Sequence, residues 1–333
     1  MTEIISIDRV KQTAQLLDPF VNRTPVTPWI GPELARRFPK NTQVSAKLEL
    51  FQHAGTFKAR GALSNILRLN RGQRGNGVTA MSAGNHAVAV AYAAKVAGVD
   101  AKVVMQKTAN PARVELAKGF GAEILMAEDG PTGFALAEKI SADEGRAFIH
   151  PFDGLDTALG TATLGLEMHQ QLGELDVLIV AIGGGGLAGG VSAITRLLNP
   201  HCHIIGVEPE GADSMHRSFA SGQPENIGIP KTIADSLAPP MTLDLPYSLC
   251  RQNINELISV SDAELIDAMG LIFRDMKLAV EPACAAATAA LLKVVYDHPG
   301  KHIGLVFCGS NIDWASFASI AGKGEDYATT HFA

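Results

Sequence analysis

The sequence is poor in aromatic residues and in paired cysteines, and it carries no excess of positive charge. Phenylalanine, tryptophan and tyrosine together make up 6% of the 333 residues, and the formal net charge is −6 at pH 7. A chain without a basic surplus is unsuited to tracking a phosphodiester backbone, so we expect no nucleic-acid partner. The four cysteines form no C-x-x-C pair, which argues against a zinc ribbon or a thioredoxin-type site and predicts reduced thiols in a cytoplasmic protein.

A signal peptide and a membrane-spanning run are also missing from the pattern. Residues 1–20 mix acidic and basic side chains among apolar ones, which no signal peptide does. Residues 177–194 carry no charge and approach spanning length, but the glycines among them would make a poor helix in lipid. A buried strand, a glycine turn and a helix explain this stretch better, so we expect a soluble protein without membrane contact.

The chain does contain a regular alternation of short runs rich in valine and isoleucine with longer runs rich in alanine. This alternation is typical of a parallel sheet covered by helices. Three strand–helix repeats and a closing strand fill residues 78–149, and the rest of the chain repeats the pattern on a larger scale. We therefore predict an α/β fold of two lobes, each a mostly parallel sheet flanked by helices, with the active site in the cleft between them.

The predicted lobes are unequal in size. Residues 71–152 would form a small substrate-side domain, and residues 1–70 and 153–333 a large cofactor-binding domain. The glycine-rich and asparagine-rich stretch at residues 72–77 and the segment at residues 150–155 are the predicted crossings between them.

Four consecutive glycines, Gly183 to Gly186, stand between a predicted strand and a predicted helix. Backbone N–H groups in such a turn can close on an anion at the positive end of the helix. The same loop permits a second interpretation, because Gly184, Gly186 and Gly189 satisfy G-x-G-x-x-G and Glu208 lies 19 residues beyond Gly189. That pattern is typical of a nicotinamide dinucleotide site, so the loop alone predicts a phosphate and leaves a dehydrogenase open.

Two other predicted strand–turn–helix junctions carry polar side chains. Lys58 stands beside Phe57 at a predicted helix start, where the helix N-terminus and partial burial disfavour the ammonium form and favour the amine that a Schiff base needs. Residues 82–86 offer a hydroxyl, an amide and backbone N–H groups to a small carboxylate. Taken singly, Lys58 would more often be a solvated lysine, and residues 82–86 a helix cap with a packed histidine.

Taken together, these segments resemble the serine/threonine dehydratase and serine racemase group of fold type II pyridoxal-phosphate enzymes, which share the fold of the tryptophan synthase β-subunit. The resemblance extends from about residue 20 to residue 320. Five motifs carry it in order: Thr56 to Gly61, Ser82 to His86, Gly183 to Leu187, Glu281-Pro282 and Cys308 to Asn311. Several motifs in register are far more specific than any one of them.

The resemblance implies a role for each motif. Lys58 would bind pyridoxal 5'-phosphate as a Schiff base and would remove the Cα proton of the substrate. Asn85 would hydrogen-bond the ring hydroxyl, and Cys308, as a neutral thiol, would face the ring nitrogen where most relatives carry serine. The predicted cofactor contacts are Lys58, Phe57, Asn85, Gly183, Gly184, Gly185, Gly186, Leu187, Glu281 and Cys308. The predicted substrate contacts are Ser82, Ala83, Gly84, Asn85 and His86.

The implied activity is that of an ammonia-lyase, which eliminates water from a small β-hydroxy amino acid such as L-serine or L-threonine and yields a 2-oxo acid and ammonia. Ala83 stands where the racemases carry a second serine, which favours elimination over racemisation. Open alternatives are a dehydratase for a bulkier substrate of the phenylserine or hydroxyaspartate type, an amino-acid racemase and, from another class, an NAD-dependent dehydrogenase. Ser236 replaces a common glycine and is expected near the substrate. We also expect a homodimer.

Relatives in this group hold Mg²⁺ or Ca²⁺ through a glutamate, a backbone carbonyl and an acidic residue. Glu208 and Ala212 match the first two positions, but Ser214 stands at the third. Because these cations prefer charged oxygen ligands, the serine weakens the predicted metal site.

Overall fold

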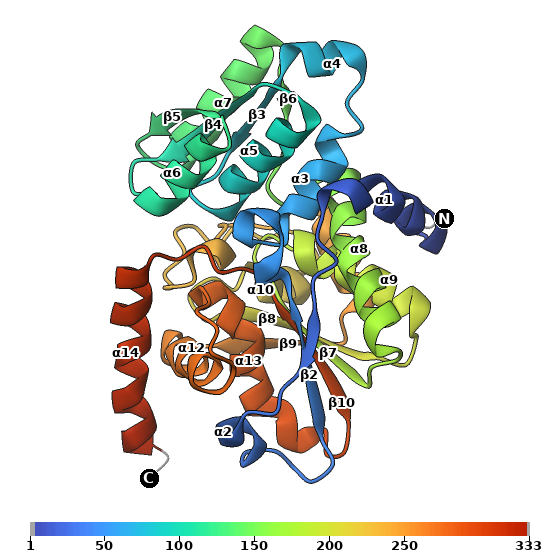
Figure 1. Cartoon of the computed structure of the whole chain (residues 1–333), viewed down its shortest axis with the longest axis vertical. Helices are drawn as coiled ribbons and strands as arrows, with labels where there is room; N and C mark the ends of the chain where they lie inside the picture. The colour runs from blue at the N-terminus through green and yellow to red at the C-terminus, as the bar shows by residue number, and fades with distance from the viewer. Residues whose placement is uncertain (1–3, 332–333) are drawn as a thin grey trace.

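Two sheets covered by helices organise the chain, and the computed structural model describes residues 4–331, with side chains described to residue 323 (Figure 1). The larger sheet has the strand order β1-β2-β10-β7-β8-β9, and the smaller sheet has the order β5-β4-β3-β6. All strand pairs are parallel except that of β1 with β2. The predicted α/β fold of two mostly parallel sheets is therefore confirmed.

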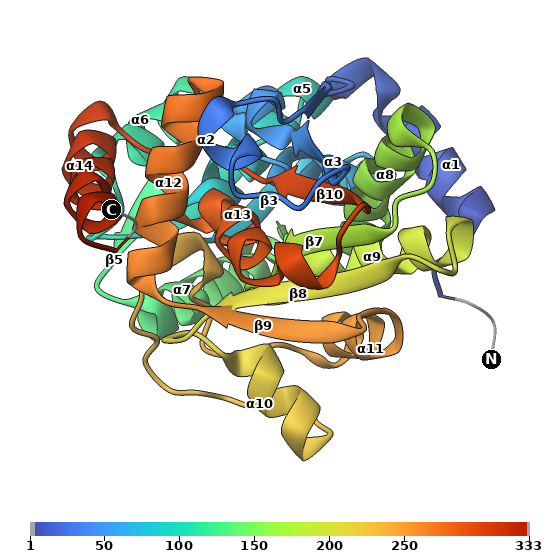
Figure 2. The same ribbon diagram turned by 90° about the horizontal axis from the view of Figure 1, so that it is seen from below.

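The strands of the larger sheet come from both ends of the chain. Their bounds are β1 Val26–Pro28, β2 Gln43–Leu48, β7 Val177–Ala181, β8 His203–Pro209, β9 Glu256–Val260 and β10 His302–Phe307. The order of β10, β7, β8 and β9 is visible in Figure 2. The smaller sheet is built from β3 Val78–Met81, β4 Ala101–Gln106, β5 Glu123–Ala127 and β6 Ala147–Phe148. All four of these strands lie inside the predicted small domain, while its exact boundaries stay a prediction.

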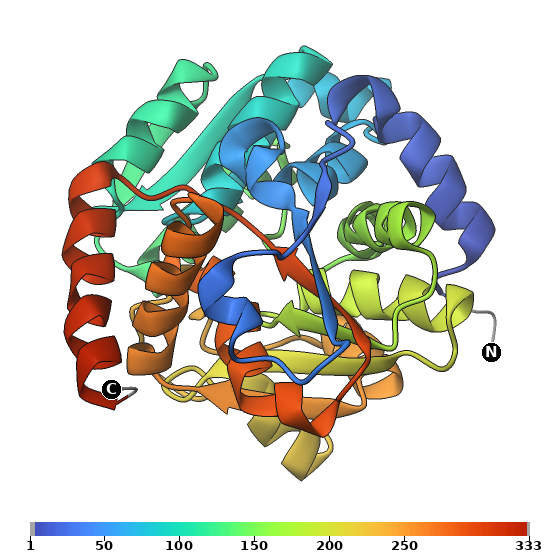
Figure 3. The ribbon, with the colours of Figure 1, turned by 60° about the horizontal axis from the view of Figure 1, so that its bottom comes forward.

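Helices cover both sheets. Those within the predicted small domain are α4 Arg71–Asn76, α5 Asn85–Ala97, α6 Pro111–Gly119 and α7 Gly130–Glu144. Those in the rest of the chain are α1 Ile7–Leu17, α2 Pro32–Ala35, α3 Lys58–Ile66, α8 Leu155–Leu172, α9 Gly186–Leu198, α10 Ser214–Ser221, α11 Asp244–Asn253, α12 Asp262–Met276, α13 Pro282–Val294 and α14 Trp314–His331. Helix α13 packs on the strands β7 to β10, and α14 lies against α12 on the outside of the lobe (Figure 3).

The central strand β7 shows no alternation of apolar and polar residues, because both of its faces are buried. Every residue of β7 is buried, because α9 and α13 both pack against this strand. Such a strand appears in the sequence as a continuous apolar run. This agrees with the buried strand expected at the start of residues 177–194. Among the described helices, none combines the length and the apolar character needed to cross a bilayer.

Parallel pairing brings the carboxyl ends of several strands to one edge. Leu48 of β2 pairs with Phe307 of β10, and β10 pairs in parallel with β7, which precedes the four glycines. An isolated bridge between Thr56 and Gly309 ties the segment before Lys58 to the segment after β10. The motifs at Lys58, the glycine loop and Cys308 therefore meet beyond the same edge, where ligands of open α/β sheets bind.

One predicted crossing between the lobes contains a short helix. Most of residues 72–77 belong to helix α4, while their role as a crossing stays a prediction. The helix begins because the Asn70 side chain accepts from the Gln73 N–H while the Gln73 side chain accepts from the Asn70 N–H. This reciprocal capping stabilises a short turn in spite of its glycines.

Candidate active site

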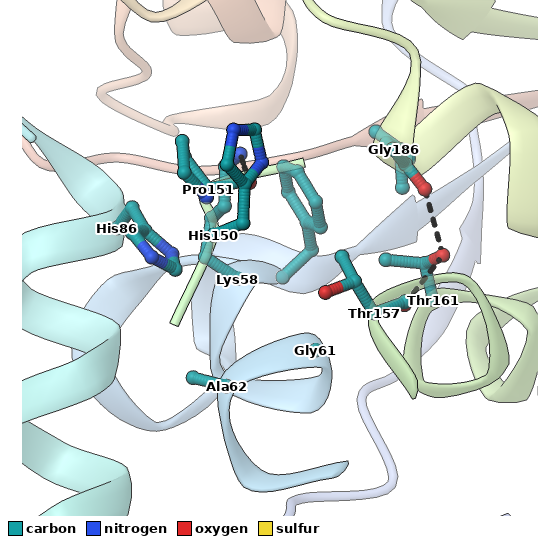
Figure 4. Close-up of a pocket in the computed structure, with 11 residues that line it drawn as sticks. Lys58, Gly61, Ala62, His86, His150, Pro151, Thr157, Thr161 and Gly186 are labelled. Carbon is teal, nitrogen blue, oxygen red and sulfur yellow. Dashed lines mark hydrogen bonds between the residues drawn. The ribbon is translucent and has the colours of Figure 1, made fainter. Parts of the chain in front are cut away.

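Lys58 is the first residue of α3, and its side chain lies partly buried where the two lobes meet (Figure 4). Its Nζ donates a hydrogen bond of 2.6 Å to the Pro151 carbonyl. Burial lowers the pKa of Lys58 to about 8, against the opposing pull of Cys308 and Glu281. The neutral amine, which is the form that attacks a carbonyl, is therefore a minor form near pH 7 but far more abundant than at the ordinary lysine pKa.

The glycine loop presents a row of unsatisfied donors. Within the described residues, no protein acceptor is found for the backbone N–H groups of residues 183–187, which run into the start of α9. Gly185 has a φ of +92°, a backbone conformation that other residues rarely adopt. At Gly186, a Cβ would lie only 2.6 Å from the Phe152 carbonyl oxygen. Adjacent amides aimed outward at a helix N-terminus fit a phosphate group, and only glycine leaves room for this path.

All ten residues predicted to contact the cofactor line one cavity at the carboxyl edge of the larger sheet. The glycine loop bounds one side of this cavity, and Lys58, Glu281 and Cys308 lie among the other lining residues. Unsatisfied amides, a lysine with a lowered pKa and a thiol around one space fit a phosphorylated aldehyde with a ring nitrogen. The residues present therefore fit pyridoxal phosphate.

Cys308 follows β10 and is 3% exposed. A hydrogen bond with Cys284 and burial raise the pKa of Cys308 well above its ordinary value. Both effects favour the neutral thiol that the resemblance implies. Its partner Cys284 is fully buried in α13, and the sequence did not suggest this contact.

Residues 82–86 connect β3 to α5 and supply a second set of free donors. The backbone N–H groups of Ala83, Asn85 and His86 have no acceptor in the part of the chain that is described, while the Ser82 hydroxyl accepts from the Gly84 N–H. Three free amides at the start of a helix fit a substrate carboxylate. His86 is buried, its Nε2 lies 2.8 Å from the Ile149 carbonyl, and burial lowers its pKa to about 3.

The Asn85 side chain makes more hydrogen bonds within the protein than the sequence suggested. Its side-chain NH2 donates to Glu281 at 2.6 Å and to Ser236 at 3.2 Å, and its Oδ1 accepts from Asn311 at 2.7 Å. Both amide hydrogens are used, so contact with a ring hydroxyl would have to use the remaining lone pair on Oδ1. Ser236 lies at the site, as expected.

A larger cavity of about 460 Å³ opens beside Lys58 and residues 82–86. One part of its wall is apolar and consists of Met81, Phe134, Phe152, Ala238, Pro239, Pro240, Met241 and Leu243. Its polar lining beyond residues 82–86 comprises Gln106, Arg113, Glu138, His150, Asp235 and Ser236. Most of these residues were not predicted, because they are scattered over loops from both lobes.

Arg113, in the first turn of α6, is the largest omission from the sequence-based site. Its guanidinium donates to Asp235, to Glu281 at 3.3 Å and to the Asn311 carbonyl at 2.8 Å. A cation in the first turn of a helix is disfavoured by the helix dipole and needs such partners. The place of Arg113 in the first turn of a predicted helix could have indicated that it needs acidic partners, but it could not have identified Asp235 and Glu281.

The predicted metal residues serve another purpose in the structure. The Glu208 carboxylate accepts hydrogen bonds from the Met215 and His216 backbone N–H groups, both at 2.8 Å, and lies 2.7 Å from His216 Nδ1. Glu208 thus stabilises the start of α10. Ser214 is the first residue of this helix, and Ala212 lies just before it. N–H groups aimed at this carboxylate do not fit a cation, and no cluster of three metal-binding side chains occurs among the described residues. The Glu208, Ala212 and Ser214 metal site stays a prediction without structural support.

Comparison with known proteins agrees with the geometry. The family described as "Pyridoxal-phosphate dependent enzyme" matches residues 17–309. Phenylserine dehydratase of Ralstonia pickettii is 56% identical over 85% of this chain and 87% of that protein. L-threo-3-hydroxyaspartate ammonia-lyase of Saccharomyces cerevisiae is 36% identical over 93% of this chain and 94% of that protein. The solved structure of maize serine racemase has a TM-score of 0.89 and 32% identity, covering 98% of this chain and 99% of that one.

Proposed function

The chain belongs to the pyridoxal-phosphate-dependent enzymes of fold type II and is a lyase of the dehydratase type, and we propose that its substrate is a β-hydroxy amino acid with an aryl side chain, of the phenylserine type. The observation that carries this proposal is the cavity of about 460 Å³ beside Lys58, with its apolar wall. Pockets for small ligands are mostly apolar, with a few polar groups that fix orientation. The 56% identity to phenylserine dehydratase supports the same substrate class.

The alternative of a nicotinamide dehydrogenase is wrong, because the family uses pyridoxal phosphate. The acidic residue that suggested a ribose contact, Glu208, is fully buried beneath the start of α10. Spacing alone cannot distinguish the two cofactors, since both place a phosphate at the N-terminus of a helix.

The polar groups would hold the substrate in one orientation. The free amides of Ala83, Asn85 and His86 would bind its carboxylate, and the Lys58 amine would take the Cα proton. The amides of residues 183–187 would hold the cofactor phosphate, and the neutral Cys308 thiol would face the ring nitrogen. When bound, pyridoxal phosphate supplies the electron sink that makes the Cα proton removable. The β-substituent is then directed towards the apolar wall.

The apolar wall argues against serine and threonine as the best substrates. A hydroxymethyl or hydroxyethyl group would leave Phe134, Met81 and Pro240 uncovered, whereas an aryl group would bury apolar surface against them. We therefore expect the enzyme to act on serine and threonine only as secondary substrates.

The charges at the cavity argue against hydroxyaspartate. A second carboxylate needs a cation, but the Arg113 guanidinium already faces Asp235 and Glu281. Glu138 adds a further acidic side chain to the lining. A substrate dianion would therefore be repelled at the position that an uncharged ring would fill.

The absence of a side-chain hydroxyl at Ala83 favours elimination. A racemase needs an acid or base on each face of Cα, and Ala83 offers none on the face opposite Lys58 in the predicted arrangement. Racemisation is therefore expected to be slower than release of the 2-oxo acid.

A substrate panel tests the proposal. We expect kcat/KM for 2-oxo acid release to be at least about 10-fold higher for phenylserine than for L-serine, L-threonine or hydroxyaspartate, since each buried methylene is worth roughly 1–3 kcal/mol in discrimination. Replacing Phe134 with alanine should lower the value for phenylserine more than that for L-serine. A preference for hydroxyaspartate or for L-serine in the native enzyme would contradict the assignment.

A further inference from the structure

His150 lies in the segment that connects the small lobe to the large lobe, and it lines the substrate cavity together with Lys58 and Phe134. The next residue, Pro151, accepts the hydrogen bond from Lys58, the proposed Cα base (Figure 4). The His150 ring centroid is 6.2 Å from that of Phe134, which belongs to the apolar wall. A substrate that reaches from Lys58 to Phe134 would therefore pass the His150 ring.

The backbone fixes which nitrogen of His150 carries the proton. Nδ1 accepts hydrogen bonds from the Asp153 N–H at 2.9 Å and from the Phe152 N–H at 3.4 Å. A backbone N–H only donates, so Nδ1 must present a lone pair and the ring proton sits on Nε2. Burial, together with the charge of Lys58 and against the pull of Asp153, lowers the pKa of His150 to about 4, which keeps the ring neutral at working pH.

The Nε2–H of His150 is available to a ligand. No partner for Nε2 is found among the side chains described up to residue 323 or the described backbone, and His150 lines the substrate cavity. Two other donor groups around this space are already used: the Asn85 amide donates to Glu281 and Ser236, and the Arg113 guanidinium is held by carboxylates. Ala83 contributes no hydroxyl.

We propose that His150 is a catalytic residue that donates its Nε2–H hydrogen bond to the departing β-oxygen. This inference rests on the proposed function only in requiring a β-hydroxy substrate, whatever its side chain. As the Cβ–O bond breaks, its electron pair goes to the oxygen, and the electrons of the Cα–H bond form the new Cα–Cβ double bond. The proton that Lys58 removes from Cα balances the hydroxide, so water forms without a net proton from His150. The histidine stabilises the charge that develops on the oxygen, and a donor fixed in advance is effective at this task.

Two substitutions separate the two nitrogens of the ring. In His150→Asn, the side-chain oxygen can still accept from the Phe152 and Asp153 amides, but the distal donor is lost. In His150→Gln, an amide N–H can reach the former Nε2 position, but the acceptor for the loop is lost. The pair therefore distinguishes support of the loop from action on the substrate.

The test compares a β-hydroxy amino acid with its β-chloro analogue, because chloride departs without a hydrogen-bond donor. We expect His150→Asn to lose about 100-fold in kcat on the β-hydroxy substrate, as for removal of a positioned hydrogen-bond donor, and to stay within a few-fold of the native enzyme on the β-chloro substrate. His150→Gln should regain part of the loss. Equal losses of His150→Asn on both substrates, or no loss on the β-hydroxy substrate, would overturn the proposal.

A measurement on the native holoenzyme checks the tautomer directly. Nitrogen-15 NMR should find the His150 proton on Nε2, and a proton on Nδ1 would also overturn the proposal. Failure of the proposed function would appear separately, as a preference of the native enzyme for L-serine over phenylserine. The leaving-group comparison can then be made with L-serine.

Discussion

Lys58 shows how one side chain can be both held and reactive. The chain places its ammonium in a buried position, yet leaves Cys308 and Glu281 near enough to limit the loss of charge. Burial raises the pKa of Glu281 to about 7, against the pull of Arg113. The pKa of Lys58 therefore depends on neighbours from distant segments of the chain. The sequence could suggest that this pKa is lowered, but it could not identify these partners.

The lowered pKa of Lys58 has a measurable consequence. The neutral fraction of a lysine grows as the pH rises through its pKa, so cofactor rebinding to the apoenzyme should accelerate with a midpoint near pH 8 rather than 10.5. Because the Glu281 carboxylate raises the pKa of Lys58, Glu281→Gln should move the midpoint to lower pH. Stopped-flow absorbance across pH 6.5–10.5 measures both, and a midpoint near 10 in the native protein would show that the amine is not buried as described.

At the scale of elements, sequence patterns predicted strands better than short helices. The predicted strand at residues 78–81 coincides with β3, because a buried parallel strand is marked by its apolar run. The sequence did not predict helices α4 and α10, because their starts depend on backbone N–H groups that donate to particular side chains. These side chains are Asn70 and Gln73 at α4, and Glu208 at the end of β8 for α10. Apolar periodicity does not encode such caps.

The junction between β7 and α9 leaves no room for a side chain at Gly186. In Gly186→Ala the added Cβ would lie 2.6 Å from the Phe152 carbonyl oxygen, so the loop must shift and its amides lose their common direction. We expect cofactor affinity to fall by about 10-fold or more, in line with the roughly 1–3 kcal/mol of overpacking. Spectroscopic titration of the apoprotein provides the affinity.

Gly75→Ala is the matched control, because a Cβ at Gly75 meets nothing within 4 Å. It should leave cofactor affinity unchanged. Equal affinity of Gly186→Ala and Gly75→Ala would contradict the role given to the loop.

At the scale of the whole molecule, the site depends on contacts between the lobes. Arg113 and Asn85 of the small lobe both reach Glu281 of the large lobe, and Asn110 donates to Asp313 at 2.6 Å. The large cavity likewise takes its walls from both lobes. The sequence identified residues that stand in motifs, but it could not identify Arg113 or His150, whose importance comes only from what the folded lobes place opposite them.

Loss of Arg113 should weaken the whole molecule. In Arg113→Ala the carboxylate of Glu281 would stay buried and lose its cationic partner, which is expected to lower the free energy of unfolding by about 3 kcal/mol. Urea denaturation measures this change. Lys107→Ala, which removes an exposed partner of Glu128, should change stability little. Similar effects of the two substitutions would contradict a structural role for the Arg113 contacts.

Lys58 is proposed to carry the cofactor at the meeting point of the two lobes. Borohydride reduction of the purified holoenzyme, followed by mass analysis of its peptides, identifies the lysine that is bound. We expect the visible absorbance band to disappear and the pyridoxyl group to be found on Lys58. A pyridoxyl label on another lysine, or a protein that takes up no pyridoxal phosphate, would contradict it.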